Sequence, residues 1–492
     1  MASTFPSRTL PTTRRGWWLT ASVLVIGFLA AFPSASADTI PDWNLITAQT
    51  LQTAKAGGGL HQSWVYAMVH GAMFNAVNAI DRRYHAYAAD LQAAPGLSQD
   101  AAAAAAAHAV LAALHPPQQE TLDAALAASL AQVQDGPAKA DGVALGKAAA
   151  EHMLTLRRHD KMREQASYVP KHGPGAFQLP ANATPLGPHW GAVTPFTLES
   201  LQDFRFPGPP ALTSARYAQD FNEVKAVGAK HSTLRTVEQT AIAMLWEPPG
   251  TLSYNAALRA MPDLTQKRMV EQARVFALLN MAGSDALIVG WRDKYLHLFW
   301  RPETAIRNAD SDGNEATAPD PAWEGLRSPF PAHPEYPSGH ALFTGVVETV
   351  LRDFFGTDRM TMTVTNPEAQ ITRSFASFSE IAQSVEDARV GGDSFPQRRH
   401  RWHRHGAADR GICAEALHAA ARAVTRREPG RRRPIHERPW CRQADGGLQG
   451  RHDRSEPACH VRDRGYQALR IAGHAHVSEV PVRAYAIKAS NV

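Results

Sequence analysis

The chain has 492 residues, of which 44% are hydrophobic and 20% are charged, so it is long enough for a large core or two domains and is not a wholly disordered chain. Three cysteines are too few for a disulfide scaffold, and they lack the paired spacing of zinc knuckles. The formal net charge of +5 is unevenly distributed, because residues 393–492 hold 20 Lys and Arg against 10 Asp and Glu, which leaves 31 against 36 in residues 1–392.

The first 37 residues are typical of an export signal. Arg14 and Arg15 precede an apolar run from Gly16 to Phe32, and Ala35-Ser36-Ala37 is a cleavage signature of the A-x-A type. The run is short for a membrane span, so we expect no stable membrane anchor. The paired arginines favour the twin-arginine route, with general secretion as the alternative. We therefore expect a periplasmic or secreted protein.

The body of the chain, residues 38–392, has mostly helical periodicity. Apolar and small residues spaced for burial run over Ser63–Ile80, an alanine-rich helix begins near Asp100 and ends at Leu114, and Gly136-Pro137 ends the next one. Residues 168–212, rich in Pro and Gly, separate a helical region at 38–167 from another at 213–392. The pattern predicts an all-α protein with two packed helical bundles joined by a loop at 168–212.

Two cations flank an apolar segment near residue 300. Lys294 and Arg301 are seven residues apart, a spacing that would place both on one face of a helix, and Leu296, Leu298, Phe299 and Trp300 between them favour burial. Buried cations require an anion for neutralisation. Taken alone, the pair is also compatible with an exposed face of an amphipathic helix.

A helix start follows about forty residues later. Ser338 is a natural N-cap for the apolar run Leu342–Phe355, Gly339 permits a close approach to the backbone, and the first-turn N–H groups favour an anion. His340 in that turn is a candidate acid–base group. Alone, this motif is also compatible with a simple capped helix.

Together, Lys294-x6-Arg301-Pro302 and Pro337-Ser338-Gly339-His340 resemble the signature of the vanadium-dependent haloperoxidases and the related type 2 phosphatidic-acid and bacterial acid phosphatases. The resemblance implies a fold of two four-helix bundles and a bound vanadate. It also implies that Lys294, Arg301, Ser338, Gly339 and the arginine of a third motif bind the vanadate oxygens, with His340 as the catalytic acid–base group.

The same resemblance implies hydrogen peroxide, a halide and a small organic acceptor as partners. Trp291 and His333 are the candidates for the halide site, since they match positions that differ between chloroperoxidases and bromoperoxidases. His333 stands where chloroperoxidases have phenylalanine, which favours bromide; the alternative is an ordinary loop histidine beside Pro334.

The third motif of the family is incomplete. Arg389 matches its arginine, but Val390-Gly391-Gly392 is followed by Asp393-Ser394-Phe395 and not by the expected vanadium-ligating histidine. Back-translation permits Ile-His-Phe-Arg-Asn one base later, and a loss of two bases would account for the frame and for the missing spacing residue. We therefore expect residues 393–492 to be an irregular basic tail read out of frame, in which His400, His403 and His405 have the wrong spacing from Arg389.

The sequence leaves three alternatives to a haloperoxidase. An acid phosphatase would use the same anion-binding residues, and an exported oxyanion-binding protein without activity would account for the absent histidine. A nucleic-acid-binding protein depends only on the basic tail, so we expect no nucleic-acid partner.

Overall fold

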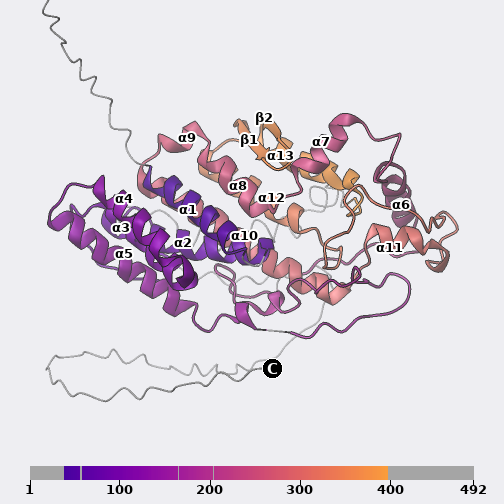
Figure 1. Ribbon diagram of the computed structural model, residues 1–492, viewed down its shortest axis with the longest axis horizontal. Helices are drawn as coiled ribbons and strands as arrows, with labels where there is room; N and C mark the ends of the chain where they lie inside the picture. Colours follow the sequence, from indigo (N-terminus) through magenta and orange to yellow (C-terminus); the bar gives the residue numbers. More distant parts are fainter. Residues whose placement is uncertain (1–37, 56–57, 165, 203, 397–492) are drawn as a thin grey trace, which may run out of the picture. The chain divides into compact units, whose positions relative to one another are not determined.

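The computed structural model describes residues 38–55, 58–164, 166–202 and 204–396. The predicted export signal, and the predicted out-of-frame tail from residue 397 onward, lie outside the described residues. Within the described ranges the chain forms thirteen α-helices and one two-stranded antiparallel sheet (Figure 1). The prediction of an all-helical fold is confirmed, with a small sheet in addition.

Five helices make up the N-terminal part: α1 (Thr39–Thr53), α2 (Gly58–Asp81), α3 (Gln99–Leu114), α4 (Gln119–Ala131) and α5 (Pro137–Leu156). The remainder comprises α6 (Ala215–Val227), α7 (Val237–Leu245), α8 (Gly250–Arg259), α9 (Pro262–Thr265), α10 (Met269–His297), α11 (Pro302–Arg307), α12 (Gly339–Phe355), β1 (Met362–Asn366), β2 (Ile371–Phe375) and α13 (Phe378–Asp387).

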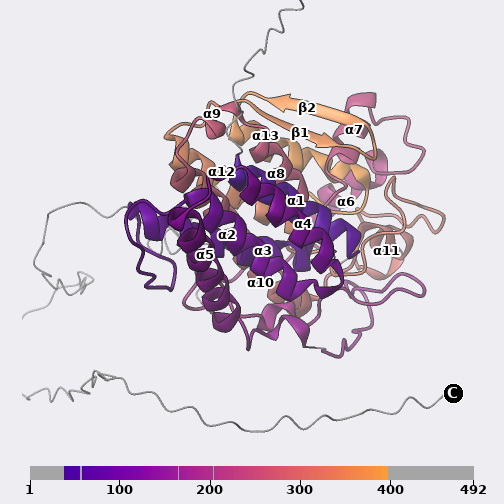
Figure 2. The same cartoon turned by 60° about the vertical axis from the view of Figure 1, so that its left-hand side comes forward.

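Helix α10 is the longest helix of the described chain and joins its two parts. It packs against α2 on one side and α12 on another, as Figures 1 and 2 show. Among the described residues only α10 is long and apolar enough to cross a membrane, but 94% of its most apolar window is buried inside the protein. Its apolar character is therefore that of a core helix, and its last turn carries Lys294 into the site described below.

Helices α3 and α5 pack with their backbones in close contact because small residues face each other. The alanine run of α3 is buried from Ala101 to Ala107, and Gly146 of α5 lies against it. A Cβ atom at Gly146 would lie 2.9 Å from both Ala105 Cβ and Ala106 N, and it would also overlap the carbonyl oxygen of Ala102. The glycine thus sets the distance between the two helices.

We expect Gly146→Ala to lower the free energy of unfolding by about 1–3 kcal/mol, because the backbone of α3 must move to admit the methyl group. This loss outweighs the roughly 1 kcal/mol that alanine gains over glycine in a helix. Urea denaturation followed by circular dichroism measures the change. Gly250→Ala is the matched control, because the nearest atom to its new Cβ lies at 3.6 Å and no loss is expected. An equal effect of both substitutions would contradict the packing argument.

Two local predictions were wrong. The helix predicted to end at Gly136-Pro137 ends earlier, at Ala131, and Pro137 instead begins α5, where its missing N–H in the first turn costs nothing. The sequence also predicts a helical run over Ser374–Arg389, but α13 begins only at Phe378, and Ser374 pairs with Thr363 in the antiparallel sheet. β-branched residues are frequent in both strands (Thr363, Val364 and Thr365 in β1, Ile371 and Thr372 in β2), which favours extended structure.

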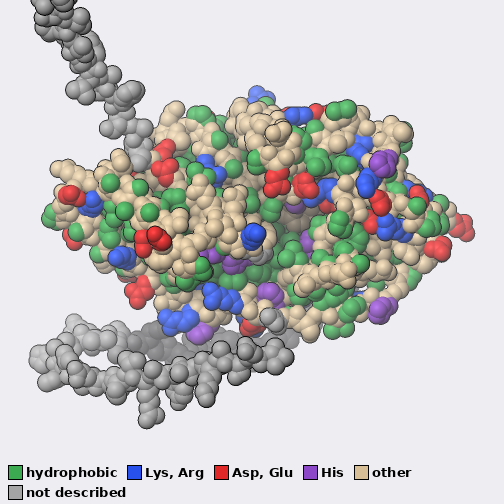
Figure 3. Space-filling model, in the orientation of Figure 1, with side chains coloured by type: hydrophobic (Ala, Val, Ile, Leu, Met, Phe, Trp, Pro, Cys, Tyr) green, Lys and Arg blue, Asp and Glu red, His purple; other side chains and the backbone are tan. Residues whose placement is uncertain are grey.

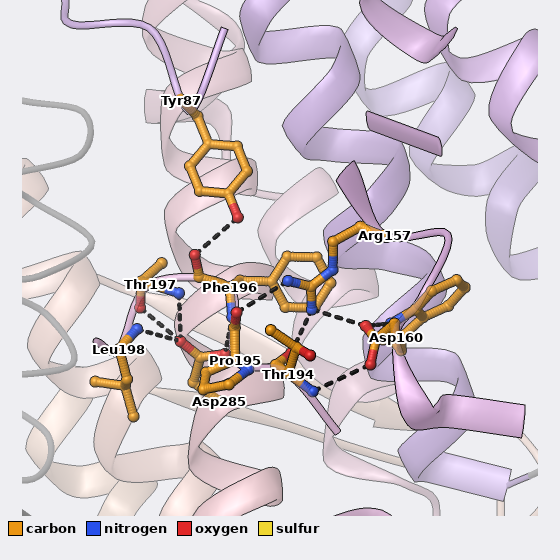
Figure 4. A network of polar contacts seen from close by, with 10 residues as sticks. Tyr87, Arg157, Asp160, Thr194, Pro195, Phe196, Thr197, Leu198 and Asp285 are labelled. Atoms are coloured by element: carbon orange, nitrogen blue, oxygen red, sulfur yellow. Dashed lines mark hydrogen bonds and ion pairs between the residues drawn. The ribbon is translucent and has the colours of Figure 1, made fainter. Parts of the chain in front are cut away.

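The segment rich in Pro and Gly, residues 168–212, is fixed to α10 by a buried carboxylate (Figure 4). Asp285 accepts hydrogen bonds from the backbone N–H groups of Phe196 (2.6 Å), Thr197 (2.7 Å) and Leu198 (3.1 Å), and from Thr197 Oγ1 (2.7 Å). The side chain is fully buried, and burial raises its pKa while the hydrogen bonds from Thr197 and Phe196 and the charge of Arg157 act in the opposite direction. The carboxylate thus replaces the regular backbone partners that this irregular segment lacks.

A second buried carboxylate holds the same segment from the other side. Asp160 pairs with Arg157 at 2.9 Å and accepts from the indole of Trp64 (2.7 Å) and the N–H of Thr194 (3.1 Å). The Arg157 guanidinium donates to the carbonyls of Thr194 and Pro195 and lies 3.8 Å from the ring centre of Phe196. The Asp160 carboxylate and the Nη1 and Nη2 groups of Arg157 therefore position residues 194–196.

The surface of the described chain mixes charges of both signs. On the face in Figure 3, acidic and basic side chains alternate over short distances. This agrees with the nearly balanced 31 basic and 36 acidic residues of positions 1–392.

Candidate functional site

Lys294 is fully buried at the end of α10 and satisfied by backbone oxygens. Its Nζ donates to the carbonyls of Pro334 and Glu335, each at 2.8 Å. Burial and the nearby Arg301 charge lower its pKa well below the usual range, while Glu335 and Asp393 act in the opposite direction. The ammonium therefore ties the end of α10 to the loop that precedes Ser338.

Arg301 reaches the same loop by a different route from the predicted one. The expected continuous helix ends at His297, Leu298 has a left-handed conformation (φ 50°), and Arg301 is the N-cap residue of α11. The two cations converge because the chain turns between them and not because they share a helix face. The argument from helix periodicity was wrong, although both side chains are buried beside residues 333–335.

The guanidinium of Arg301 lies between His333 and the C-terminal end of the described chain. Nε donates to the His333 carbonyl (3.0 Å), Nη1 to the Asp393 carbonyl (2.7 Å), and Nη2 lies 3.0 Å from His333 Nδ1. Burial, followed by the charges of Arg301 and Lys294, lowers the pKa of His333 well below its usual range. The imidazole is therefore neutral and in direct contact with a cation.

Trp291 packs directly beside His333 and Lys294. Its ring centre is 4.9 Å from that of His333 and 5.3 Å from Lys294 Nζ, and its indole N–H donates to the Leu186 carbonyl at 3.2 Å. A Cβ atom at Gly339 would lie 2.9 Å from the Trp291 ring, so this position requires glycine. The two candidate halide-site residues are thus brought into contact with each other.

Ser338 and His340 are placed by the start of α12. Ser338 Oγ accepts from the N–H of Ala341 at 3.3 Å, which confirms the predicted N-cap. His340 Nε2 lies 3.1 Å from the Pro248 carbonyl, which only accepts, so Nε2 carries the proton and Nδ1 is the acceptor of the neutral ring. Burial lowers the pKa of His340, with the Pro248 contact acting in the opposite direction.

Arg389 lines a cavity together with Ser338 and His340, but its guanidinium is bound by a carboxylate that lies outside this cavity. Nη2 and Nε donate to Glu223 of α6 at 2.6 and 3.1 Å, and Nη1 donates to the Glu386 carbonyl at 2.8 Å. The structure therefore brings Arg389 next to Ser338 and His340 while pairing its charge with Glu223.

Three charged residues at this place were missed by sequence reasoning. Arg327 Nη1 forms an ion pair with Asp393 Oδ2 at 3.1 Å, and both side chains line the cavity together with Ser338 and His340. The buried Glu335 carboxylate accepts from the N–H of Phe395 at 3.2 Å. Only the position of Glu335, directly before the second motif, was a signal that could have drawn attention to it.

The charged side chains at this place form a cluster that is poorly suited to bind a small anion while the Asp393 carboxylate is present. Lys294, Arg301 and Arg327 contribute three positive charges, and Glu335 and Asp393 contribute two negative ones, so the formal balance is +1. The cavity has a volume of about 60 Å³, room for a few water molecules. The arrangement can neutralise an oxyanion chemically, but an internal carboxylate already neutralises part of the charge.

Comparisons with known proteins point to one family. Residues 274–405 match the family model described as the VCPO second helical-bundle domain. The vanadium chloroperoxidase of Curvularia inaequalis is 31% identical over 180 residues, an alignment that covers 30% of this chain and 29% of that protein. The match thus spans less than a third of the length of the curated relative.

Solved structures extend the likeness to most of the described chain. A bacterial vanadium-dependent iodoperoxidase has a TM-score of 0.64 at 21% identity, covering 78% of this chain and 95% of its own. A holo-type bacterial vanadium-dependent chloroperoxidase has a TM-score of 0.60 at 18% identity, covering 75% and 94%. At these identities the likeness concerns the fold, and the family-model match contains the residues from Lys294 to Asp393 described above.

Proposed function

Because the chain belongs to the vanadium-dependent haloperoxidase family, we propose that its gene encodes a vanadate-dependent enzyme that oxidises halide with hydrogen peroxide. The observation that carries the proposal is the convergence of Lys294 and Arg301 beside the capped helix start at Ser338 and His340. Fixed donors and cations in a buried site are what stabilisation of an oxyanion requires.

The printed chain does not fit the family's cofactor. Among the described residues after Arg389, that is up to Pro396, there is no histidine, and the Asp393 carboxylate lies in the cavity paired with Arg327. A second anion in the same place would be repelled by that carboxylate. We derive no reaction step through vanadate for this chain, and we expect the printed form to lack peroxidase activity.

A shift of reading frame after Gly392 accounts for the misfit. With the codon choice that back-translation permits, inserting two nucleotides between the codons of Gly392 and Asp393 gives Arg389-x5-His followed by Phe-Arg, the spacing that the family resemblance implies. The clustering of all three cysteines and of 17 arginines against one lysine after residue 400 supports a change of frame. The proposed enzyme is the product of this restored frame.

The finer properties of the proposed enzyme follow from the first part of the chain and from His333. The segment 1–37 supports export to the periplasm or the medium. The contact of the neutral His333 with Trp291 and Arg301 supports bromide as the preferred halide, with a small organic molecule as the final acceptor.

Resequencing the codons from Arg389 to His405, followed by assay of both reading frames, tests the proposal. The restored-frame protein is expected to consume hydrogen peroxide in the presence of vanadate and bromide, and the printed chain to remain at the vanadate-free background. Hydrolysis of p-nitrophenyl phosphate without vanadate would favour the acid phosphatase. Vanadate binding by the restored-frame protein without any turnover would favour an inactive oxyanion-binding relative.

A further inference from the structure

We propose that Arg327 is a third anion-binding cation of this site and that, in the printed chain, the Asp393 carboxylate is its resident anion. The inference rests on the proposed function only in treating the site as one for oxyanions. It assigns the affinity of the site for external anions to the pair of Arg327, which lies outside the family motifs, and Asp393, which stands within the span of the incomplete third motif.

The position of Arg327 supports the first part. Its side chain is 18% exposed and borders the cavity that Ser338 and His340 also line. Nη1 is 3.1 Å from Asp393 Oδ2, and Nη2 is 3.4 Å from the Glu247 carbonyl. The buried Nε of Arg327 has no hydrogen-bond partner within the described chain, so this N–H group of the guanidinium remains available to a ligand.

The position of Asp393 supports the second part. Its carbonyl accepts from Arg301 at 2.7 Å while its carboxylate pairs with Arg327, so a single residue connects two of the three cations. The neighbouring Phe395 fixes this arrangement by packing against Phe299 and Tyr217, with ring centres 6.1 and 5.9 Å away. The carboxylate is therefore held in place by packing and not only by its charge.

The charge balance gives the expected consequence. With Asp393 ionised, the cluster of Lys294, Arg301, Arg327, Glu335 and Asp393 carries a formal charge of +1; with asparagine in its place, the charge is +2 and the side chain retains a similar volume. An external oxyanion must displace or tolerate the carboxylate in the printed chain. Removal of the negative charge therefore strengthens anion binding.

Isothermal titration of the full-length printed chain with orthovanadate tests the inference. We expect Asp393→Asn to bind at least about tenfold more tightly than the parent, because a like charge a few ångströms away is removed. Adding Arg327→Gln to that variant is expected to remove the gain. Asp135→Asn, whose side chain is 94% exposed, is the matched control for the change in net charge and should leave affinity unchanged.

The outcomes separate this inference from the proposed function. Equal affinities of the parent and Asp393→Asn would overturn the inference while leaving an anion site in place. Absence of binding in the parent and in every variant would overturn the inference alone, because the proposed function concerns the restored-frame protein and is tested by its own peroxidase assay. Circular dichroism checks folding, and if Asp393→Asn does not fold, Asp393→Ser replaces it with the same expectation. Affinity that rises equally in Asp135→Asn would also overturn the inference, since it would reflect net charge alone.

Discussion

Replacing Asp285 by alanine is expected to lower the free energy of unfolding by about 3–5 kcal/mol. The carboxylate accepts from three backbone N–H groups and one hydroxyl at 2.6–3.1 Å, and none of these donors would reach water in its absence without displacing the segment. Each buried donor left without a partner costs about 1–3 kcal/mol. Because local rearrangement gives some of these donors new partners, the expected loss of about 3–5 kcal/mol is smaller than the sum of the individual costs.

Urea denaturation of the Asp285 variant, compared with Asp135→Asn, measures this effect. Asp135 is exposed and pairs only with Lys139, so its change should be within about 1 kcal/mol. Intrinsic fluorescence reports on Trp190, which is buried in the same segment. A loss below 1 kcal/mol in the Asp285 variant would mean that other contacts position residues 196–198.

Replacing Arg301 by glutamine is expected to be about as costly, again about 3–5 kcal/mol, because one partner of a buried charge cluster is removed. The guanidinium is 2% exposed, and it neutralises the buried Glu335 and Asp393 carboxylates while satisfying the carbonyls of His333 and Asp393. Glutamine retains a polar amide, but it lacks the positive charge of arginine and the set of N–H donors of the guanidinium.

A double-mutant cycle with Asp393→Asn distinguishes charge from packing in this result. If the cost arises from uncompensated carboxylates, the loss caused by Arg301→Gln should be smaller in the Asp393→Asn background by 1 kcal/mol or more. Arg359→Gln, at an exposed position after α12, serves as the control and should change stability little. Additive losses would contradict the electrostatic explanation and assign the effect to packing.

The fold was predictable from the sequence where a local pattern coincided with burial. The alanine run of α3 and the cap at Ser338 have signals within one or two helical turns, and both appear where expected. The hairpin at 362–375 was not predicted, since its strands are five residues each and only Ser374 and Phe375 fell within a predicted element, the helical run from Ser374 to Arg389. Short strands carry too few residues for the period to be decisive.

The candidate site was predictable only in part, for a related reason. Lys294 and Arg301 were identified by their spacing, although a turn at Leu298 and not a helix face brings them together. The pairing of Arg327 with Asp393 joins residues 66 positions apart, each in an irregular segment. No periodicity or motif encodes such a contact, because it arises from the approach of two distant segments, which are also joined by the hydrogen bond from the Arg327 N–H to the Gly391 carbonyl (3.0 Å).

The anchoring of residues 194–198 also has a consequence for the timing of synthesis. The carboxylate that fixes this segment, Asp285, is 87 to 89 positions further along the chain. At about 5–20 residues per second, a ribosome needs roughly 4–18 s to add that interval. For those seconds Phe196 and Leu198 have no α10 to pack against, and the segment has only its contacts with Tyr87, Arg157 and Asp160 of the N-terminal part. Residues 194–198 therefore reach their final contacts only after α10 has been synthesised.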